Sequence, residues 1–267
     1  MEQTLHLSNT TLVVTFRCNL KCKLCAVSAP YYTVPTHYSL ESLIESVRRY
    51  FEVVDNVDKF TINGGEPLLH PQLPDIMDFI IKYIDRIGTL EIITNGAVAP
   101  DKRLLNSLSR SGKIDILVDN YGPELSAKVP QIVEDFNEAG IKHRVRKYYG
   151  EDAHFGGWVD LLDLSKKNRT ADETENIYKR CAYPGPFRCF VIFDGKAYIC
   201  GVYKRCESLG IIPDNPSEYV DFSSDSEPIE EKRKQIQNFY NRRFFSACEY
   251  CNGFCEDSKR YAPAEQL

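Results

Sequence analysis

The chain has 267 residues, of which 43% are apolar and 27% are charged, a composition typical of a folded protein rather than a disordered one. Its net charge of −5 argues against a protein that binds nucleic acid in bulk. It has no run of eighteen apolar residues, and its first residues lack the basic and apolar regions of a signal peptide, so we expect a cytoplasmic protein. Ten cysteines in such a chain favour metal or redox chemistry over disulfides.

Short apolar runs alternate with amphipathic stretches over the first 160 residues, which predicts strands alternating with helices. The expected strands cover residues 11–17, 58–63, 89–94, 113–119 and 141–149, with a short sixth strand around 157–162. Helices are expected around residues 40–51, 73–84, 104–108 and 129–136. Such alternation is typical of an α/β fold with a parallel sheet and right-handed crossovers. Because this is too few units for the eight-unit TIM barrel, we expect an open, partial (β/α)6 barrel.

The pattern changes from about residue 165 onward. A polar stretch with a short helix near 172–180 leads to a β-hairpin over 188–200 that turns at Asp194-Gly195, and a further helix is expected over 229–243. We therefore divide the chain into a barrel over residues 1–165 and a small domain over residues 166–267. The second part is too small for a large core of its own, and a metal cluster is a common substitute for such a core.

The ten cysteines lie in three groups, and residues 26–180 contain none. Cys18, Cys22 and Cys25 form a C-x3-C-x2-C loop directly after the first expected strand. A closed zinc site needs four ligands, and no further cysteine or histidine lies near this loop. Three thiolates on one loop can instead hold three irons of a [4Fe–4S] cluster and leave the fourth iron open to a ligand.

Polar and glycine-rich segments follow the next three expected strands. Gly64-Gly65-Glu66-Pro67 follows the second strand, Thr94-Asn95-Gly96 follows the third and Asp119-Asn120 follows the fourth. Because the chemistry of parallel α/β proteins lies where strands end, we expect these segments and the cysteine loop to meet at one edge of the sheet. Taken alone, the glycine pair also fits an ordinary strand-to-helix turn.

With these motifs in place, the chain resembles the radical S-adenosylmethionine (SAM) superfamily over roughly residues 8–160. The resemblance rests on the cysteine loop after the first strand and on the GGEP segment after the second. It implies that Cys18, Cys22 and Cys25 hold a [4Fe–4S] cluster whose open iron binds SAM, and that a flavodoxin- or ferredoxin-type protein donates the electron. Such enzymes cleave SAM reductively to methionine and a 5′-deoxyadenosyl radical, which takes a hydrogen atom from the substrate.

The resemblance also implies which residues contact SAM. In this family the GGEP segment receives the SAM amino group at its backbone and its glutamate, and polar residues after later strands add further contacts. The expected SAM contacts in this chain are Gly64, Gly65, Glu66, Asn95, Asp119 and Asn120. No catalytic residue is assigned by the resemblance.

The cysteines of the second part resemble those of the twitch domain, the shortened form of the SPASM domain that holds an auxiliary [4Fe–4S] cluster. The spacing of Cys181, Gly195 and Cys200, followed by a C-x2-C pair, matches that pattern. The resemblance implies one auxiliary [4Fe–4S] cluster with four ligands, Cys181, Cys200, Cys248 and Cys251. Cys189 is a rival of Cys181, because it falls opposite Cys200 on the expected hairpin. The alternative interpretation of the four thiolates is a zinc ribbon.

Two features near the end of the barrel each allow two interpretations. The strand over residues 142–147 reads KHRVRK, which forms either an ion-paired strand face or, where alternation turns it inward, a site for an anionic substrate. His154 and Trp158 either line the substrate pocket or belong to a plain loop with one buried aromatic.

In size and cysteine layout the chain is most similar to the 2-deoxy-scyllo-inosamine dehydrogenases of this superfamily. The similarity implies oxidation of a secondary alcohol on a sugar, nucleotide-sugar or aminocyclitol, with the auxiliary cluster as electron acceptor. Residues 154–157 read HFGG where those enzymes have an arginine-glycine-glycine stretch, which argues against an identical substrate.

Two other reactions stay open. The first is maturation of a ribosomal peptide, although such enzymes commonly carry an added recognition domain and only about ten residues precede the first strand here. The second is radical epimerisation, with Cys189, Cys206 or Cys255 returning the hydrogen atom. We therefore expect a carbohydrate-like small molecule or a peptide as substrate, and no nucleic-acid or membrane partner.

Overall fold

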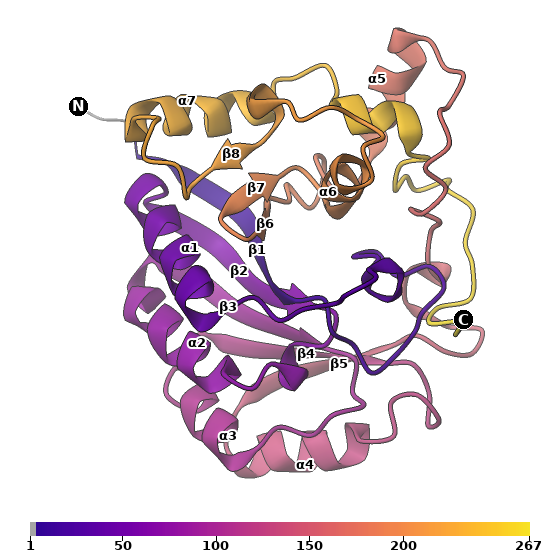
Figure 1. Cartoon of the computed structure of the whole chain (residues 1–267). Coiled ribbons are helices and arrows are strands. Elements are labelled where there is room, and N and C mark those ends of the chain that lie inside the picture. Colours follow the sequence, from indigo (N-terminus) through magenta and orange to yellow (C-terminus); the bar gives the residue numbers. More distant parts are fainter. Residues whose placement is uncertain (1–3) are drawn as a thin grey trace.

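The computed structural model describes residues 4–267 and contains one eight-stranded sheet in the order β5-β4-β3-β2-β1-β6-β7-β8 (Figure 1). Its first five strands are parallel and comprise β1 (His6–Thr15), β2 (Asn56–Gly64), β3 (Ile87–Thr94), β4 (Ile114–Asn120) and β5 (Lys142–Lys147). Three shorter strands extend it beyond β1, namely β6 (Val191–Phe193), β7 (Lys196–Tyr198) and β8 (Val220–Asp221). The sheet does not close, so the expected α/β partial barrel is confirmed.

The expected helices between the strands are also present, and they cover the outer face of the sheet (Figure 1). They comprise α1 (Leu40–Val53), α2 (Leu73–Ile80) with its continuation Ile81–Arg86, α3 (Lys102–Leu108) and α4 (Val129–Glu138). The later helices are α5 (Ala171–Arg180), α6 (Gly201–Ser208) and α7 (Ile229–Phe239), of which only α6 was not expected from the sequence. None of the helices within residues 4–267 combines the length and apolar character that a membrane crossing requires.

The prediction of a sixth strand over residues 157–162 is wrong. Trp158 forms only an isolated bridge, with Tyr261 from the far end of the chain. The place beside β1 is taken by β6, which runs parallel to β1 and turns into β7 at Asp194 and Gly195. Both turn residues have positive φ, 48° and 78°, as a two-residue hairpin turn of type I′ requires. A short apolar run does not show which distant segment it pairs with. In this fold β6 of the later hairpin, and not residues 157–162, pairs with β1.

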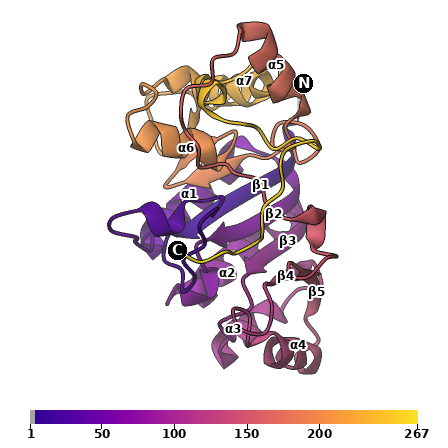
Figure 2. The same cartoon turned by 90° about the vertical axis from the view of Figure 1, so that its right-hand side faces the viewer.

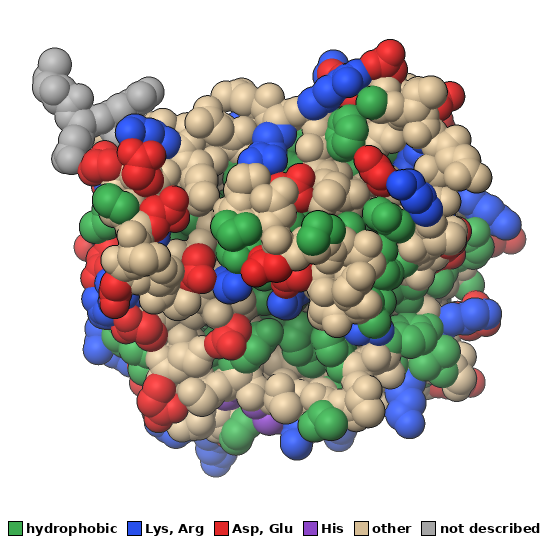
Figure 3. Space-filling model, turned by 45° about the horizontal axis from the view of Figure 1, so that its top comes forward, with side chains coloured by type: hydrophobic (Ala, Val, Ile, Leu, Met, Phe, Trp, Pro, Cys, Tyr) green, Lys and Arg blue, Asp and Glu red, His purple; other side chains and the backbone are tan. Residues whose placement is uncertain are grey.

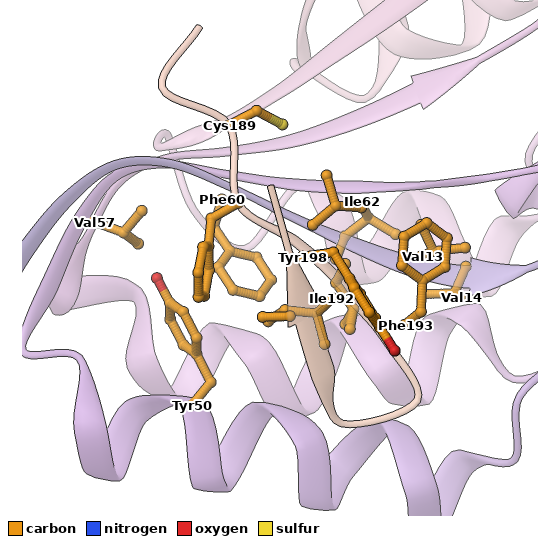
Figure 4. Close-up of a cluster of buried hydrophobic side chains, with 14 of the residues drawn as sticks. Val13, Val14, Tyr50, Val57, Phe60, Ile62, Cys189, Ile192, Phe193 and Tyr198 are labelled. Carbon is orange, nitrogen blue, oxygen red and sulfur yellow. The ribbon is translucent and has the colours of Figure 1, made fainter. Parts of the chain in front are cut away.

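The hairpin joins the barrel through a shared hydrophobic core (Figure 4). Phe60 of β2 and Tyr50 of α1 pack edge to face, with ring centroids 5.5 Å apart. Ile192 of β6 and Tyr198 of β7 belong to the same cluster and are completely buried. The two parts predicted from the sequence, residues 1–165 and 166–267, therefore share one sheet and one core.

The surface carries both signs of charge. On the face shown in Figure 3, basic and acidic side chains are interspersed, and apolar side chains gather toward the lower right of the view. The described residues on this face thus form no continuous basic surface of the kind that nucleic-acid backbones require.

Candidate active site

The loop after β1 brings three thiols to one cleft. Cys18, Cys22 and Cys25 all line this cleft, whose volume of about 340 Å³ is in the range of small-molecule sites. Burial, together with a smaller contribution from the neighbouring Cys25, raises the pKa of Cys18 to about 12 and that of Cys22 to about 11. The residues that line the cleft include no fourth cysteine and no histidine. The loop therefore fits three corners of an iron–sulfur cluster better than a closed zinc site.

The GGEP segment packs against residues 15–17, where the cysteine loop begins. The Gly65 N–H donates to the Thr15 carbonyl oxygen and the Glu66 N–H to the Arg17 carbonyl oxygen, each at 2.8 Å. A Cβ atom on Gly65 would lie 2.2 Å from the Arg17 oxygen, and one on Gly64 would lie 2.5 Å from the Thr15 oxygen. Both glycines also line the cleft. Their missing side chains thus let the segment pack on the strand end that carries the cysteines.

A Gly65→Ala change is expected to lower the free energy of unfolding by about 1–3 kcal/mol, because its Cβ would collide with backbone that has no room to move. It should also reduce the iron bound after anaerobic reconstitution. The matched control is Gly112→Ala, since a Cβ there meets no atom within 4 Å; it should change stability by less than about 0.5 kcal/mol. Thermal melts measure the stability of each variant, and iron assays measure its iron content. Equal stability and equal iron content of the two variants would contradict the packing argument.

The Glu66 side chain connects the GGEP segment to the Thr94-Asn95-Gly96 segment through hydrogen bonds. Its carboxylate is completely buried and accepts hydrogen bonds from the Leu68 N–H, the Thr94 hydroxyl and the Asn95 N–H, at 2.8–3.0 Å. Burial raises the pKa of Glu66 to about 7, against the effect of these donors. Asn95 lines the cleft, and its side-chain amide nitrogen donates to the side-chain Oδ1 of Asn19 at 2.9 Å. Glu66 itself is not among the cleft residues, so its contact with SAM stays a prediction, and the structure shows it positioning Asn95.

The two predicted residues at the end of β4 make different contacts. Asp119 lines the cleft, and Arg146 of β5 donates to its two oxygens at 2.6 and 2.8 Å. Burial raises the pKa of the Asp119 carboxyl, while Arg146 opposes this shift. The Asn120 side chain instead accepts a hydrogen bond from the Gly122 N–H at 2.9 Å, and it does not line the cleft. The basic residues of β5 are thus ion-paired, as one of the two interpretations predicted.

Aromatic side chains form much of the remaining wall of the cleft. Trp158 is among them, which confirms its place in the pocket, whereas His154 is not a lining residue. The aromatic wall comprises Tyr121, Tyr148, Phe155, Trp158, Tyr183, Phe187 and Phe254. The sequence could have indicated Tyr121, which follows Asp119-Asn120 directly. It carries no local signal for Phe187 or Phe254, because these residues reach the cleft only through the long-range fold.

A second cavity collects the four thiols that the C-terminal pattern predicts. Its walls include Cys181, Cys200, Cys248 and Cys251, and burial raises the pKa of the last two to about 12. The Phe254 N–H donates to the Cys181 sulfur at 3.4 Å and the Gly253 N–H to the Cys251 sulfur at 3.3 Å.

The other three cysteines lie outside this cavity. Cys189, Cys206 and Cys255 are buried but are not among its lining residues, nor among those of the cleft. Between the two candidates for the first position, the structure thus places Cys181, not Cys189, with Cys200, Cys248 and Cys251. The cleft and the second cavity are neighbours, because Leu161 and Tyr183 line both.

The sequence of the chain matches a known protein family. The model of the radical SAM superfamily matches residues 12–145. The GTP 3′,8-cyclase of Nautilia profundicola is 26% identical to this chain over 216 residues. The match covers 76% of this chain and 65% of that protein. The matches to two further GTP 3′,8-cyclases span half or less of the length of those proteins.

Solved structures share the fold over nearly the whole chain. SuiB of Streptococcus suis has a TM-score of 0.58 at 15% identity, covering 99% of this chain and 77% of its own. BtrN in complex with AdoMet and 2-DOIA has a TM-score of 0.53 at 17% identity, covering all of both chains. The family match, the three thiols on one loop and the adjoining GGEP segment lead to one conclusion: the chain belongs to the radical SAM superfamily, whose enzymes cleave SAM at a [4Fe–4S] cluster.

Proposed function

We propose that the chain oxidises a secondary alcohol on a sugar-like ring, using a second, auxiliary [4Fe–4S] cluster held by Cys181, Cys200, Cys248 and Cys251. The observation that carries the proposal is the thiol-lined cavity directly beside the cleft, with Leu161 and Tyr183 as shared walls. When bound, SAM with its cluster supplies an acceptor for the carbinol hydrogen atom, and the auxiliary cluster supplies an acceptor for one electron. The hydroxyl proton must then pass to a base of the chain, and the carbinol becomes a carbonyl.

Two further features of the second cavity suit a bound cluster. Tyr178 lines this cavity, and its buried hydroxyl has no hydrogen-bond partner among residues 4–267. A cluster in the cavity would offer sulfur acceptors to such a hydroxyl. Arg169 fixes the C-x2-C pair by donating to the Cys248 and Cys251 carbonyl oxygens at 2.8 and 2.6 Å.

The residues that line the cleft favour an uncharged, ring-shaped substrate over a nucleoside triphosphate. Arg146 is the one cation among the lining residues, and Asp119 already neutralises it. A triphosphate calls for several unpaired Lys or Arg side chains, so the lining argues against GTP, which gives the curated relatives their name. The aromatic wall can pack on the apolar faces of a ring, and the ion pair can bind hydroxyl groups.

The position of the spare thiols bears on the epimerase alternative. An epimerase of that kind needs a thiol that reaches the substrate radical and returns a hydrogen atom. Cys189, Cys206 and Cys255 do not line the cleft, which favours oxidation over epimerisation.

Asp119 is the proton acceptor that the proposal needs, since it is the one carboxylate that lines the cleft. Asp119→Asn should therefore lower carbonyl product by about 10²–10⁴-fold while 5′-deoxyadenosine release falls much less. The matched control is Asn120→Ser, because the Asn120 side chain is turned toward Gly122 and should affect neither product. Equal loss of both products in Asp119→Asn would instead assign Asp119 to SAM binding.

The test of the reaction follows deuterium. A panel of aminocyclitols and sugars deuterated at their carbinol carbons, GTP deuterated at C3′, and α-deuterated peptides are incubated separately with reduced protein and SAM. We expect deuterium in 5′-deoxyadenosine, together with a carbonyl product, from a carbinol probe. Transfer from GTP or from a peptide alone would overturn the proposed function.

A further inference from the structure

The segment from Tyr261 to Leu267 lies along the cysteine loop, far from it in sequence (Figure 2). The Tyr261 and Trp158 backbones exchange hydrogen bonds of 2.8 and 2.9 Å at the mouth of the barrel. Further on, the Lys23 N–H donates to the Glu265 carbonyl oxygen at 2.7 Å and the Leu267 N–H to the Lys21 carbonyl oxygen at 2.9 Å. The segment is thus paired with the loop on both sides of Cys22.

The Gln266 side chain forms a hydrogen bond with Cys22, one of the predicted cluster ligands. Its oxygen accepts a hydrogen bond from the Lys21 N–H at 2.7 Å. Its amide nitrogen donates to the Cys22 sulfur at 3.4 Å and to the Ala264 carbonyl oxygen at 2.6 Å. Ala264 is 1% exposed and packs against Leu20 and Cys22, which fixes the segment on the loop. Both ends of the amide are therefore held, and one N–H points at sulfur.

We propose that Gln266 is a positioning residue that sets the orientation of Cys22 and raises the reduction potential of the SAM-binding cluster. Reduction adds negative charge to a cluster and its thiolates, and an N–H donor to sulfur stabilises that charge. The inference goes beyond the proposed function, because it concerns only the cluster common to the superfamily and holds for any substrate. A Gln266 side chain from one end of the chain would thereby control how easily the loop near the other end is reduced.

The test uses two variants that divide the roles of Gln266. Gln266→Glu keeps the oxygen that accepts from Lys21 and removes the N–H donor to sulfur, whereas Gln266→Met removes both. The control is Glu265→Gln, which breaks the exposed ion pair with Lys23 but leaves the Cys22 sulfur untouched. The readout is the midpoint potential in an anaerobic redox titration followed by electron paramagnetic resonance. The signal that changes on addition of SAM identifies the relevant cluster.

Both Gln266 variants should show a more negative potential, with about a tenfold loss in the equilibrium constant for reduction, which corresponds to about 59 mV for one electron. The Glu265→Gln control should match the unmodified protein. Loss of iron from a Gln266 variant whose apoprotein melts at the unmodified temperature also supports the proposal, because Cys22 is then misplaced. The proposal would be overturned if both variants carried a full cluster at the potential of the unmodified protein. It would also be overturned if both apoproteins melted at a lower temperature, because Gln266 would then have only a structural role.

Discussion

Replacing Cys18 by alanine is expected to abolish 5′-deoxyadenosine release from SAM in the presence of dithionite. Cys18, Cys22 and Cys25 are the only cysteines among the residues that line the cleft, so no other thiol is placed to replace Cys18. Loss of outer contacts to a metal ligand commonly costs about 10–100-fold in activity or affinity, and loss of the ligand itself should cost more. The measurement is quantification of 5′-deoxyadenosine by mass spectrometry after anaerobic reconstitution.

The matched control for Cys18→Ala is Cys189→Ala. Cys189 is equally a free thiol and is buried, but it lies in neither cavity. Its replacement should leave the release of 5′-deoxyadenosine close to that of the unmodified protein. Undiminished release from the Cys18 variant would contradict the placement of the SAM-binding cluster on the loop after β1.

The double change Cys248→Ala with Cys251→Ala is expected to separate SAM cleavage from substrate oxidation. Two ligands are removed because three thiols suffice to hold a cluster, as they do in the first loop. Cys18, Cys22 and Cys25 line the cleft and not the second cavity, so 5′-deoxyadenosine release should persist. Carbonyl product should fall below detection, since the electron left after hydrogen abstraction has no acceptor. The ratio of the two products, measured with the probe that transfers deuterium, reports this directly.

Cys255→Ala is the control for that double change. Cys255 follows the C-x2-C pair closely in sequence, is 3% exposed, and does not line the second cavity. It should leave the product ratio unchanged. If the double variant kept full carbonyl production, the auxiliary cluster would not be the electron acceptor, and the oxidation mechanism proposed here would be wrong.

Much of the fold could be predicted because its signals are local. The apolar runs that became β1 to β5 alternate with amphipathic helices, and Asp194-Gly195 marks a hairpin turn wherever the hairpin packs. The cysteine loop and the GGEP segment were also placed correctly at one edge of the sheet, since parallel strands end on the same side.

The features that the sequence did not show depend on contacts between distant segments. Residues 157–162 look like a strand, but Trp158 pairs with Tyr261 and the hairpin fills the place beside β1. Spacing favours Cys181 but leaves Cys189 as a rival, because Cys189 falls opposite Cys200 on the expected hairpin. Only the fold shows that Cys181 faces the cavity and that Gln266 reaches the Cys22 sulfur across 244 positions.

The central claim is that two iron–sulfur clusters adjoin one substrate cleft, and the metal content of the protein tests it most directly. Iron, sulfide and zinc are quantified per chain after anaerobic reconstitution and removal of unbound metal. We expect about eight irons and eight sulfides with no zinc, as two [4Fe–4S] clusters require. About four irons together with one zinc would contradict it, because the second set of thiols would then form a zinc ribbon.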